Sequence, residues 1–189
     1  MIMDKRWFFI LPFFLLFAAC GDDEPDVPEG AIEFSYDGEN LTAPTLPEGL
    51  YEFAARFPNS LTSREEGRAI TQVSFYLTDI PAELCVNFSV DQSSTIPTDP
   101  IYGEIITNLQ AGAWNTVTLQ EPFVLDGSSI WVGIKVVHDR QQQSVGCDAG
   151  PAFANGDWLY DEETFTWETF TNRTGGAESV NWNIKAIIQ

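Results

Sequence analysis

From Ala31 onward, apolar and polar residues alternate along short segments, so that every second side chain lies on the same face. In Tyr51–Phe57, for example, three aromatic residues and Ala55 share one face. A period of two predicts β-strands, and no window has the length and period of a helix. The predicted strands are Ala31–Tyr36, Tyr51–Phe57, Ala69–Thr78, Glu83–Val90, Ile101–Leu109, Trp114–Leu119, Ser129–His138, Asp157–Tyr160, Phe165–Phe170 and Val180–Ile188.

Turn-forming residues separate these segments, among them Asp37-Gly38, Asp126-Gly127 and Asn155-Gly156. Short strands at regular spacing predict a sandwich or a barrel. We expect an all-β fold, a β-sandwich of jelly-roll type, formed by residues 31–189 as one domain. The composition, 44% hydrophobic and 20% charged, is typical of a globular domain. Ser129–His138 is apolar on both faces, which predicts a central strand covered on both sides.

Residues 1–19 have the pattern of a secretory signal peptide. Lys5 and Arg6 precede an apolar run that ends at Ala19 and is too short to span a bilayer as a helix. The run Leu-Phe-Ala-Ala-Cys that ends at Cys20 resembles the lipobox of bacterial lipoproteins, which implies that Cys20 is lipidated and becomes the mature N-terminus. The alternative is a secreted protein with an incidental cysteine.

Residues 20–30 are rich in acidic residues and proline, so we expect an extended, disordered tether between the lipid and the domain. Asp22, Asp23 and Glu24 resemble the acidic export signal of lipoproteins in Bacteroidota-type bacteria. That resemblance implies a protein anchored in outer-membrane lipid by the acyl chains of Cys20 and facing the cell exterior. The alternative is a solvated linker without a sorting role.

The charge and the titratable residues exclude several functions. Nine Lys and Arg against 28 Asp and Glu give a net charge of -19, which argues against nucleic acid as a partner. His138 is the one histidine of the chain, and we expect it at the surface where a strand ends. The adjacent acids Glu65-Glu66 and Asp161-Glu162-Glu163 read as solvated charges on exposed turns. We therefore expect a protein that is not an enzyme.

Several motifs occur in a characteristic order: the stretch from Gly112 through Trp114-Asn115 to Leu119, then Ile130-Trp131-Val132-Gly133, Asp148-Ala149-Gly150-Pro151, and Asn181-Trp182-Asn183-Ile184. In this order they resemble the cleaved-adhesin jelly-roll domains of bacterial surface lipoproteins. The same residues also have structural explanations. Trp114 and Trp131 are expected to fill the core from facing strands, and Gly133 to allow close strand packing.

The resemblance implies binding of host proteins, carbohydrate or neighbouring domains, often with structural calcium. It makes Asp148 and Asp37 the candidate calcium ligands, since Ca²⁺ takes oxygen ligands. The sequence contains no EF-hand loop. No other cofactor is expected, and the absence of any calcium site is the alternative.

Two cysteines remain once Cys20 is lipidated. Cys85 falls on the opposite face of its strand from Leu84 and Val86, and Cys147 falls in a loop. An oxidising compartment permits a disulfide between Cys85 and Cys147, and two free thiols are the alternative.

Four aromatic residues, Trp158, Tyr160, Phe165 and Trp167, cluster around turns near the C-terminal end. Aromatic rings at the rim of a sandwich can stack on sugars, whereas the alternative is that they pack in the core. The sequence thus favours a non-catalytic surface lipoprotein with an adhesin-like binding domain, for adhesion or ligand capture. A carbohydrate-binding accessory lipoprotein of a polysaccharide-uptake system is the alternative, followed by a glycan-active enzyme.

Overall fold

A computed structural model describes Pro25 and residues 27–189. The expected signal peptide, the lipidation site Cys20 and the acidic residues Asp22, Asp23 and Glu24 lie outside the described residues. Among the residues that are described, no helix is long and apolar enough to cross a membrane.

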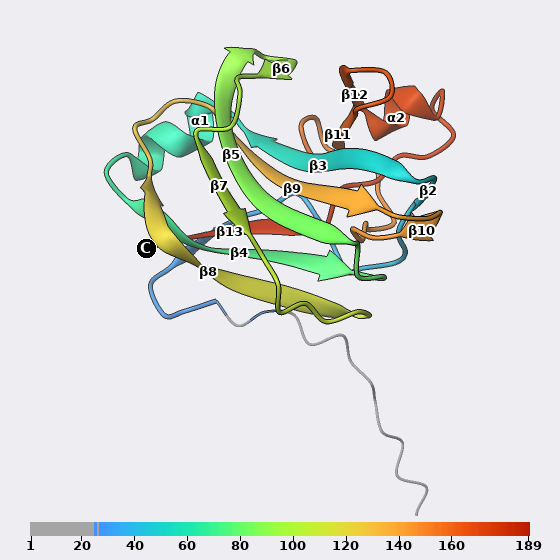
Figure 1. Cartoon of the computed structure of the whole chain (residues 1–189). Coiled ribbons are helices and arrows are strands. Elements are labelled where there is room, and N and C mark those ends of the chain that lie inside the picture. Colours follow the sequence, from blue (N-terminus) through green and yellow to red (C-terminus); the bar gives the residue numbers. More distant parts are fainter. Residues whose placement is uncertain (1–24, 26) are drawn as a thin grey trace, which may run out of the picture.

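Two antiparallel sheets stack face to face (Figure 1). In order across the larger, seven-stranded sheet lie β12 (Thr166–Thr169), β11 (Trp158–Asp161), β3 (Gly49–Phe57), β9 (Ile130–His138), β5 (Glu83–Ser93) and β6 (Ile96–Pro97), and β7 (Tyr102–Ile105) also pairs with β5. The four-stranded sheet has the order β1 (Ile32–Phe34), β13 (Ile184–Ile188), β4 (Ala69–Leu77) and β8 (Ala113–Val124).

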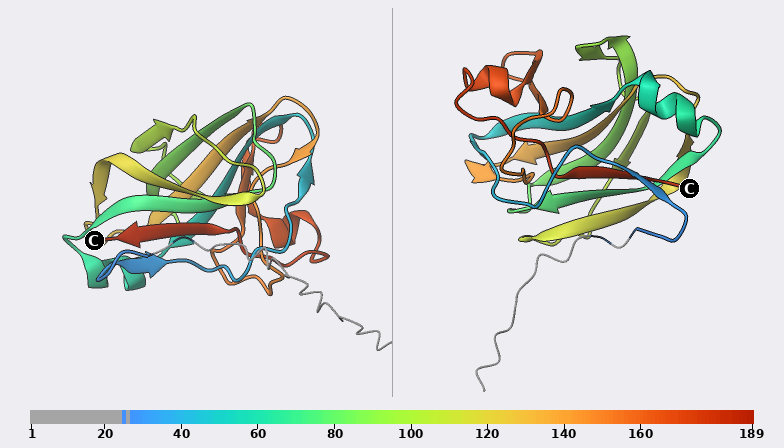
Figure 2. Two further views of the ribbon diagram at one scale, coloured as in Figure 1. Left: turned by 90° about the horizontal axis from the view of Figure 1, so that it is seen from below. Right: turned by 180° about the vertical axis from the view of Figure 1, so that it is seen from behind.

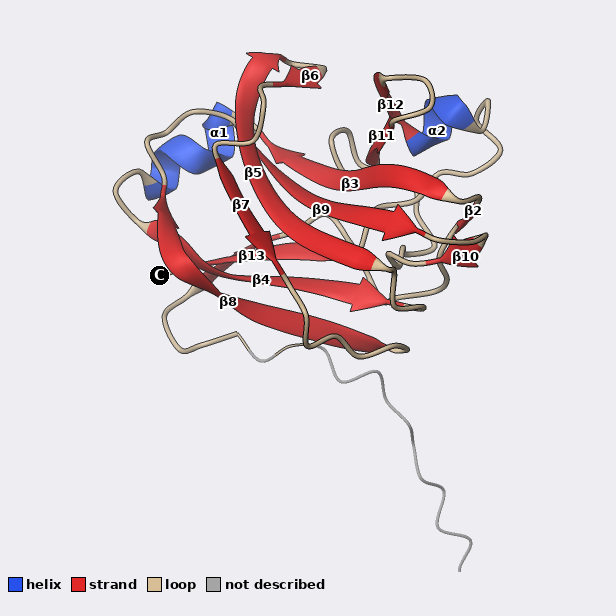
Figure 3. Ribbon diagram, in the orientation of Figure 1, coloured by secondary structure: helices blue, strands red, loops and turns tan. Residues whose placement is uncertain are grey.

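The remaining elements are short. β2 (Thr45–Leu46) pairs with β10 (Gln142–Gln143), and the helices α1 (Asn59–Thr62) and α2 (Phe170–Arg173) lie at opposite ends of the sandwich (Figure 3). A 3₁₀ turn, Ser63–Glu65, follows α1. The all-β prediction is confirmed, because the two packed sheets form a sandwich and helices account for only a few turns.

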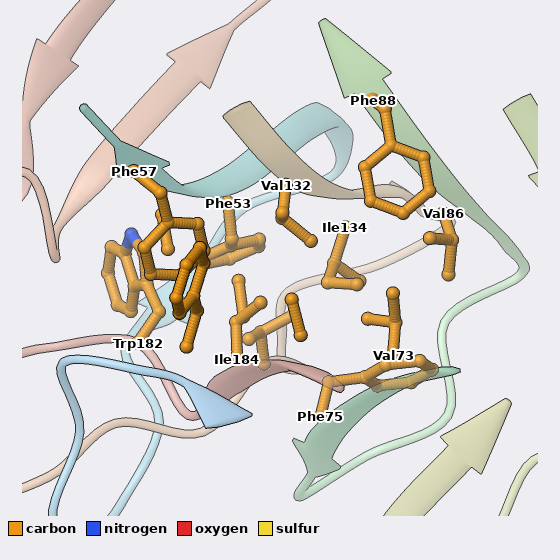
Figure 4. Packing of buried hydrophobic residues seen from close by; sticks show 14 of the residues in the cluster. Phe53, Phe57, Val73, Phe75, Val86, Phe88, Val132, Ile134, Trp182 and Ile184 are labelled. Carbon is orange, nitrogen blue, oxygen red and sulfur yellow. The ribbon is translucent and has the colours of Figure 1, made fainter. Parts of the chain in front are cut away.

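The core fills the space between the two sheets. Phe53, Val132 and Val86 of the seven-stranded sheet meet Phe75 and Ile184 of the four-stranded sheet, and all five side chains are fully buried (Figure 4). Every second residue of each strand enters this layer, as the alternation in the sequence requires. The energy of the fold therefore comes mainly from apolar area removed from water.

Each predicted strand segment contains a strand, and the central position of β9 is confirmed. β9 lies between β3 and β5. Its residues Ile130, Val132, Ile134 and Val136 face the core. On its other face Trp131 is only 2% exposed, since it is covered by aromatic residues of β11 and β12.

Trp114 departs from the expectation that it fills the core opposite Trp131. Its ring packs edge-on against Tyr76 at 6.0 Å, and the ammonium of Lys185 lies 4.8 Å from the ring centroid. Tyr76 and Lys185 alternate with the core residues of β4 and β13. Trp114 therefore covers the face of the four-stranded sheet that points away from the core.

Cys85 and Cys147 are free thiols in the structure, not the expected disulfide. Cys85 follows the core residue Leu84 along β5, so it faces away from the core. Cys147 is 2% exposed and belongs to the core between the sheets. The two side chains therefore lie on opposite sides of one sheet, where they cannot bond without a rearrangement of the backbone.

Candidate functional site

One row of side chains crosses the outer face of the seven-stranded sheet, the face that points away from the core. Strand pairing places its members next to one another, each on a different strand. In order across the sheet, the row consists of Trp167, Tyr160, Glu52, Lys135, Cys85 and Ile105. We call these six residues the outer row; it runs from aromatic rings through two opposite charges to aliphatic residues.

An aromatic cluster forms one end of the outer row. Trp131 packs at 5.1 Å from Trp158 and at 5.4 Å from Trp167, and Tyr160 lies 5.5 Å from Trp167. Trp131 and Trp158 are buried, whereas Tyr160 and Trp167 are half-buried. The cluster thus has a buried base of two indoles and presents two rings to solvent.

The structure divides the four aromatic candidates of the sequence. Tyr160 and Trp167 are half-buried and present their rings to solvent, whereas Trp158 is buried beneath them. Phe165 is 76% exposed on the turn between β11 and β12 and lies outside the cluster.

Glu52 is held over a glycine. An ideal Cβ on Gly133 would lie 2.1 Å from its Oε1, so only glycine leaves room for the carboxyl at this place. Burial raises the pKa of Glu52 to about 7, while a hydrogen bond from Asn87 and the charge of Lys135 lower it by less. A carboxyl that titrates near neutral pH can donate or accept a hydrogen bond.

Lys135 is half-buried in the middle of the outer row. Strand pairing places it directly opposite Glu52, yet the two side chains form no ion pair within 4.0 Å, because Glu52 leans over Gly133 toward Asn87. The ammonium is therefore left for other partners.

A partly buried ion pair stabilises the end of this face. Arg56 donates from Nε to Oδ1 of Asp91 at 2.8 Å and from Nη2 to Oδ2 at 2.6 Å. Trp131 Nε1 donates to the same Oδ1 at 2.7 Å. The Arg56 guanidinium holds the pKa of Asp91 below its ordinary value. A bidentate pair of this kind fixes the orientation of Trp131, and with it the base of the aromatic cluster.

Two pockets lie along the outer row, and both are lined by Lys135 and Pro100. One has a volume of about 230 Å³ and is lined by polar and aromatic residues, including Glu52, Ser89, Thr98, Lys135, Tyr160 and Trp167. We call it the aromatic pocket. The other, of about 320 Å³, is lined by aliphatic residues such as Leu50, Ile105 and Val137. The strand β6 and the pair β11–β12 rise on this side of the sheet (Figure 3).

Both carboxylate oxygens of Asp148, a candidate calcium ligand, already accept two hydrogen bonds each. Oδ1 accepts from the backbone N–H of Asn181 at 2.7 Å and of Gly150 at 2.8 Å. Oδ2 accepts from the Asn181 side chain at 2.9 Å and from the N–H of Gly38 at 3.0 Å. Its four hydrogen bonds tie three segments of the chain together, which gives Asp148 a structural role.

Asp37, the other candidate, lies beside oxygens that have no partner. Asp37 Oδ1, Asn40 Oδ1 and Asn183 Oδ1 are all buried and have no hydrogen-bond partner among the described residues. Asn183 Nδ2 donates to the second oxygen of Asp37 at 3.0 Å, and the Asn40 and Asn183 oxygens lie 2.4 and 3.1 Å from an ideal Cβ on Gly146. Burial raises the pKa of Asp37 to about 6. Buried oxygens without donors are costly and are the ligands that Ca²⁺ takes, so these residues fit the ion.

No group of three or more His, Cys, Asp and Glu side chains placed to hold a metal occurs in the described part of the chain. The Asp37 cluster differs from such groups because two of its three members are asparagines, whose side-chain oxygens are neutral.

His138 is buried, contrary to the expectation that it lies at the surface. It is 1% exposed on the core side of β9, and its Nε2 lies 2.8 Å from the hydroxyl of Ser144, which is equally buried. Burial lowers the pKa of His138. Because a nucleophile must reach its substrate, this pair gives no support to serine chemistry.

Asp161 is also buried, although the sequence suggested a solvated acid. It is 4% exposed, and its Oδ2 accepts from Arg173 Nη2 at 2.5 Å. The neighbouring Glu162 and Glu163 are exposed, as expected. Asp161 thus connects β11 to α2 and does not act as a free carboxylate.

The sequence missed Glu52, Lys135 and Asn87, the polar members of the site. One signal was present: Lys135 is the single charged residue between Ser129 and Asp139, inside an otherwise apolar strand. A cation retained at the centre of a sheet indicates either a buried ion pair or a binding site.

The comparisons with known proteins identify a fold and no family. No family model matches the chain, and no curated protein matches it. A solved structure, of the cysteine protease and lectin-like domains of Cwp84, a surface layer associated protein of Clostridium difficile, aligns with a TM-score of 0.52 at 12% identity. The alignment covers 77% of this chain and 33% of that chain, so this protein spans about a third of its neighbour.

Proposed function

We propose that the domain is a non-catalytic saccharide-binding module of jelly-roll type, displayed at the cell surface by lipidated Cys20. The sequence favoured two non-catalytic functions, an adhesin-like lipoprotein and a carbohydrate-binding lipoprotein. The proposed function corresponds to the second of these. The observation that carries the proposal is the aromatic pocket, where two half-buried rings adjoin a carboxyl and an ammonium. Sugar rings stack on aromatic faces while their hydroxyls take hydrogen bonds from polar groups. The solved structure that aligns with this chain includes a lectin-like domain, which also supports saccharide binding.

A glycan array followed by calorimetry tests this proposal. Trp167→Ala should lower the affinity for the best glycan at least tenfold, since a ring that anchors a ligand is worth about 1.4 kcal/mol or more. Phe165→Ala is the matched control, because it removes an exposed ring from the same β11–β12 hairpin outside the pocket. Equal losses in both variants would contradict the assignment of the pocket. Hydrolysis of a glycan by the wild-type protein would contradict its non-catalytic nature.

Surface display rests on Cys20 and the acidic residues that follow it. Cys20→Ala should abolish labelling by a fatty-acid analogue and partitioning into the detergent phase. Neutralising Asp22, Asp23 and Glu24 together should protect the protein from protease added to whole cells. If the triple variant is digested as readily as the parent, the acidic residues serve only as a linker.

We also propose that Asp37, Asn40 and Asn183 hold a structural Ca²⁺. The ion would be coordinated by their three buried oxygens, which have no hydrogen-bond donor among the described residues. Calcium should raise the melting temperature. At a calcium concentration 100 times the dissociation constant, the free energy of unfolding should increase by about 2.7 kcal/mol. Asp37→Asn should remove that response, whereas Glu39→Gln, an exposed acid two residues away, should keep it. A calcium response that survives in Asp37→Asn would place the ion elsewhere.

A further inference from the structure

Lys135 differs from most other cations of the described chain in having no counter-ion. Arg56, Arg68, Arg140, Arg173 and Lys185 each have a carboxylate oxygen within 3.5 Å. Within the described residues Lys135 has none, although it is half-buried and lines both pockets of the outer face. A partly buried ammonium without a carboxylate partner costs free energy, and an anionic ligand would repay that cost.

The reason for the missing pair lies in the neighbouring strand. Glu52 is the cross-strand neighbour of Lys135, and opposite charges in that relation normally attract. Instead, the space above Gly133 and the amide of Asn87 hold the carboxyl of Glu52. The sheet thus keeps a carboxyl and an ammonium side by side without joining them.

We propose that the ligand of the aromatic pocket is an acidic saccharide, whose carboxylate accepts hydrogen bonds from the Lys135 ammonium while a sugar ring lies against Tyr160 and Trp167. This inference rests on the proposed function and names the class of sugar for the same site. Lys135 and the two rings line the same pocket, so one saccharide can meet all three.

The charges around Glu52 make this recognition dependent on pH. Five residues from the neighbouring segments lie around Glu52: Lys135 of β9, Asn87 and Cys85 of β5, Tyr160 of β11, and Asp99 before β7. Lys135 is the one cation among these five. Glu52 becomes protonated as the pH falls through about 7, which removes a negative charge from the neighbourhood of Lys135. Affinity for an acidic sugar should therefore rise from pH 8 to pH 6.

The net charge of -19 opposes acidic ligands at a distance. At physiological ionic strength that repulsion is screened beyond about 8 Å, so the contact itself decides the affinity. Asp99 at the rim of the aromatic pocket and Glu83 in the aliphatic pocket remain as local negative charges.

Calorimetry with an oligogalacturonate and with its methyl ester tests the inference, because the two sugars differ only at the carboxyl group, which is charged in the acid and neutral and methylated in the ester. The wild-type protein should bind the acid at least tenfold more tightly than the ester at pH 6. Lys135→Met should remove that preference, and Lys135→Arg should retain it. Arg64→Met is the control, since it removes an exposed cation that has no ion pair and lies outside the pocket. Urea unfolding of each variant establishes that it is folded.

The outcomes separate this inference from the proposed function. If the acid and the ester bind equally, or if only neutral glycans bind and depend on Trp167, saccharide binding stands and the acidic preference is overturned. If no glycan binds at all, the proposed function fails. A sulfated oligosaccharide that binds more tightly than the oligogalacturonate, and depends on Lys135, would overturn the assignment to a carboxylate.

Discussion

The outer faces of the two sheets carry similar residues, but these residues are paired differently on the two faces. On the four-stranded sheet, Lys185 contacts Glu33 at 3.5 Å and lies over Trp114, and Ser74 shares a hydrogen bond of 2.9 Å with Thr116. On the seven-stranded sheet, Lys135 has no carboxylate partner in the described chain.

The same contrast extends to other groups of the seven-stranded sheet. Trp158 Nε1 is buried without a hydrogen bond, and Glu52 loses much of its hydration. Both faces contain a lysine, a glutamate and at least one tryptophan, so composition does not distinguish them. What distinguishes the seven-stranded sheet is that Lys135 and Trp158 Nε1 have no partner within the described residues, and unpartnered polar groups are expected of a binding surface.

The two cysteines provide the largest expected effect, because one lies on this open face and the other lies in the core. Cys147 is buried and its pKa is raised to about 12 by burial, whereas Cys85 is half-buried. In the native protein Cys85 should react with a small alkylating reagent on the order of a hundredfold faster than Cys147. Mass mapping of tryptic peptides measures both rates, and protection of both cysteines without reductant would indicate a disulfide after all.

A matched pair of lysine substitutions tests the comparison itself. Lys185→Met should cost about 2 kcal/mol of unfolding free energy, because it leaves Glu33 without its partner and removes the contact with Trp114. Lys135→Met should leave it unchanged or raise it, because the half-buried ammonium has no carboxylate partner to lose in the described chain. Urea unfolding measures both. Equal costs would show that Lys135 has a structural partner and would remove the contrast between the faces.

The pH dependence of stability gives a smaller effect. Because the pKa of Glu52 is raised from 4.5 to about 7, the folded state retains a proton that the unfolded state loses between these values. The contribution of Glu52 to stability is therefore fully present below pH 4.5 and is lost as the pH rises through 7, in the same direction as the contribution of Asp37, whose pKa is raised to about 6.

Glu52→Gln should make this decline shallower and stabilise the protein at pH 8 by about 1 kcal/mol, while leaving the contribution of Asp37 in place. Glu162→Gln, an exposed acid beside β11, is the control. Urea midpoints at several pH values provide the measurement. Parallel curves for Glu52→Gln and the wild type would mean that Glu52 is as well hydrated as Glu162.

The sequence predicted the strands well because alternation is a local property. Every predicted segment contains a strand, and the four residues predicted to share a face of Tyr51–Phe57 all lie in the core. It missed β2, β6 and β10, each of which is only two residues long. Two residues are too few to form an alternating pattern.

The sequence predicted only the part of the site whose residues are close together in the chain. Tyr160 and Trp167 belong to adjacent strands of one hairpin, so their proximity could be read from the sequence. Glu52 and Lys135 are neighbours only through the pairing of β3 with β9, which are far apart in the chain. The burial of His138 and Asp161 and the separation of the two cysteines depend in the same way on which strands pair and which sheet each one joins.

The position of β1 has a consequence for how such a domain would be oriented on a membrane. β1 is an edge strand of the four-stranded sheet (Figure 2), and strand pairing places the outer row on the far face of the other sheet. A tether that precedes β1 therefore joins the domain on the side opposite the pockets. If the chain is anchored through Cys20, the sandwich acts as a spacer one domain thick, and the face that carries Lys135 and Trp167 points away from the lipid toward polymers outside the cell.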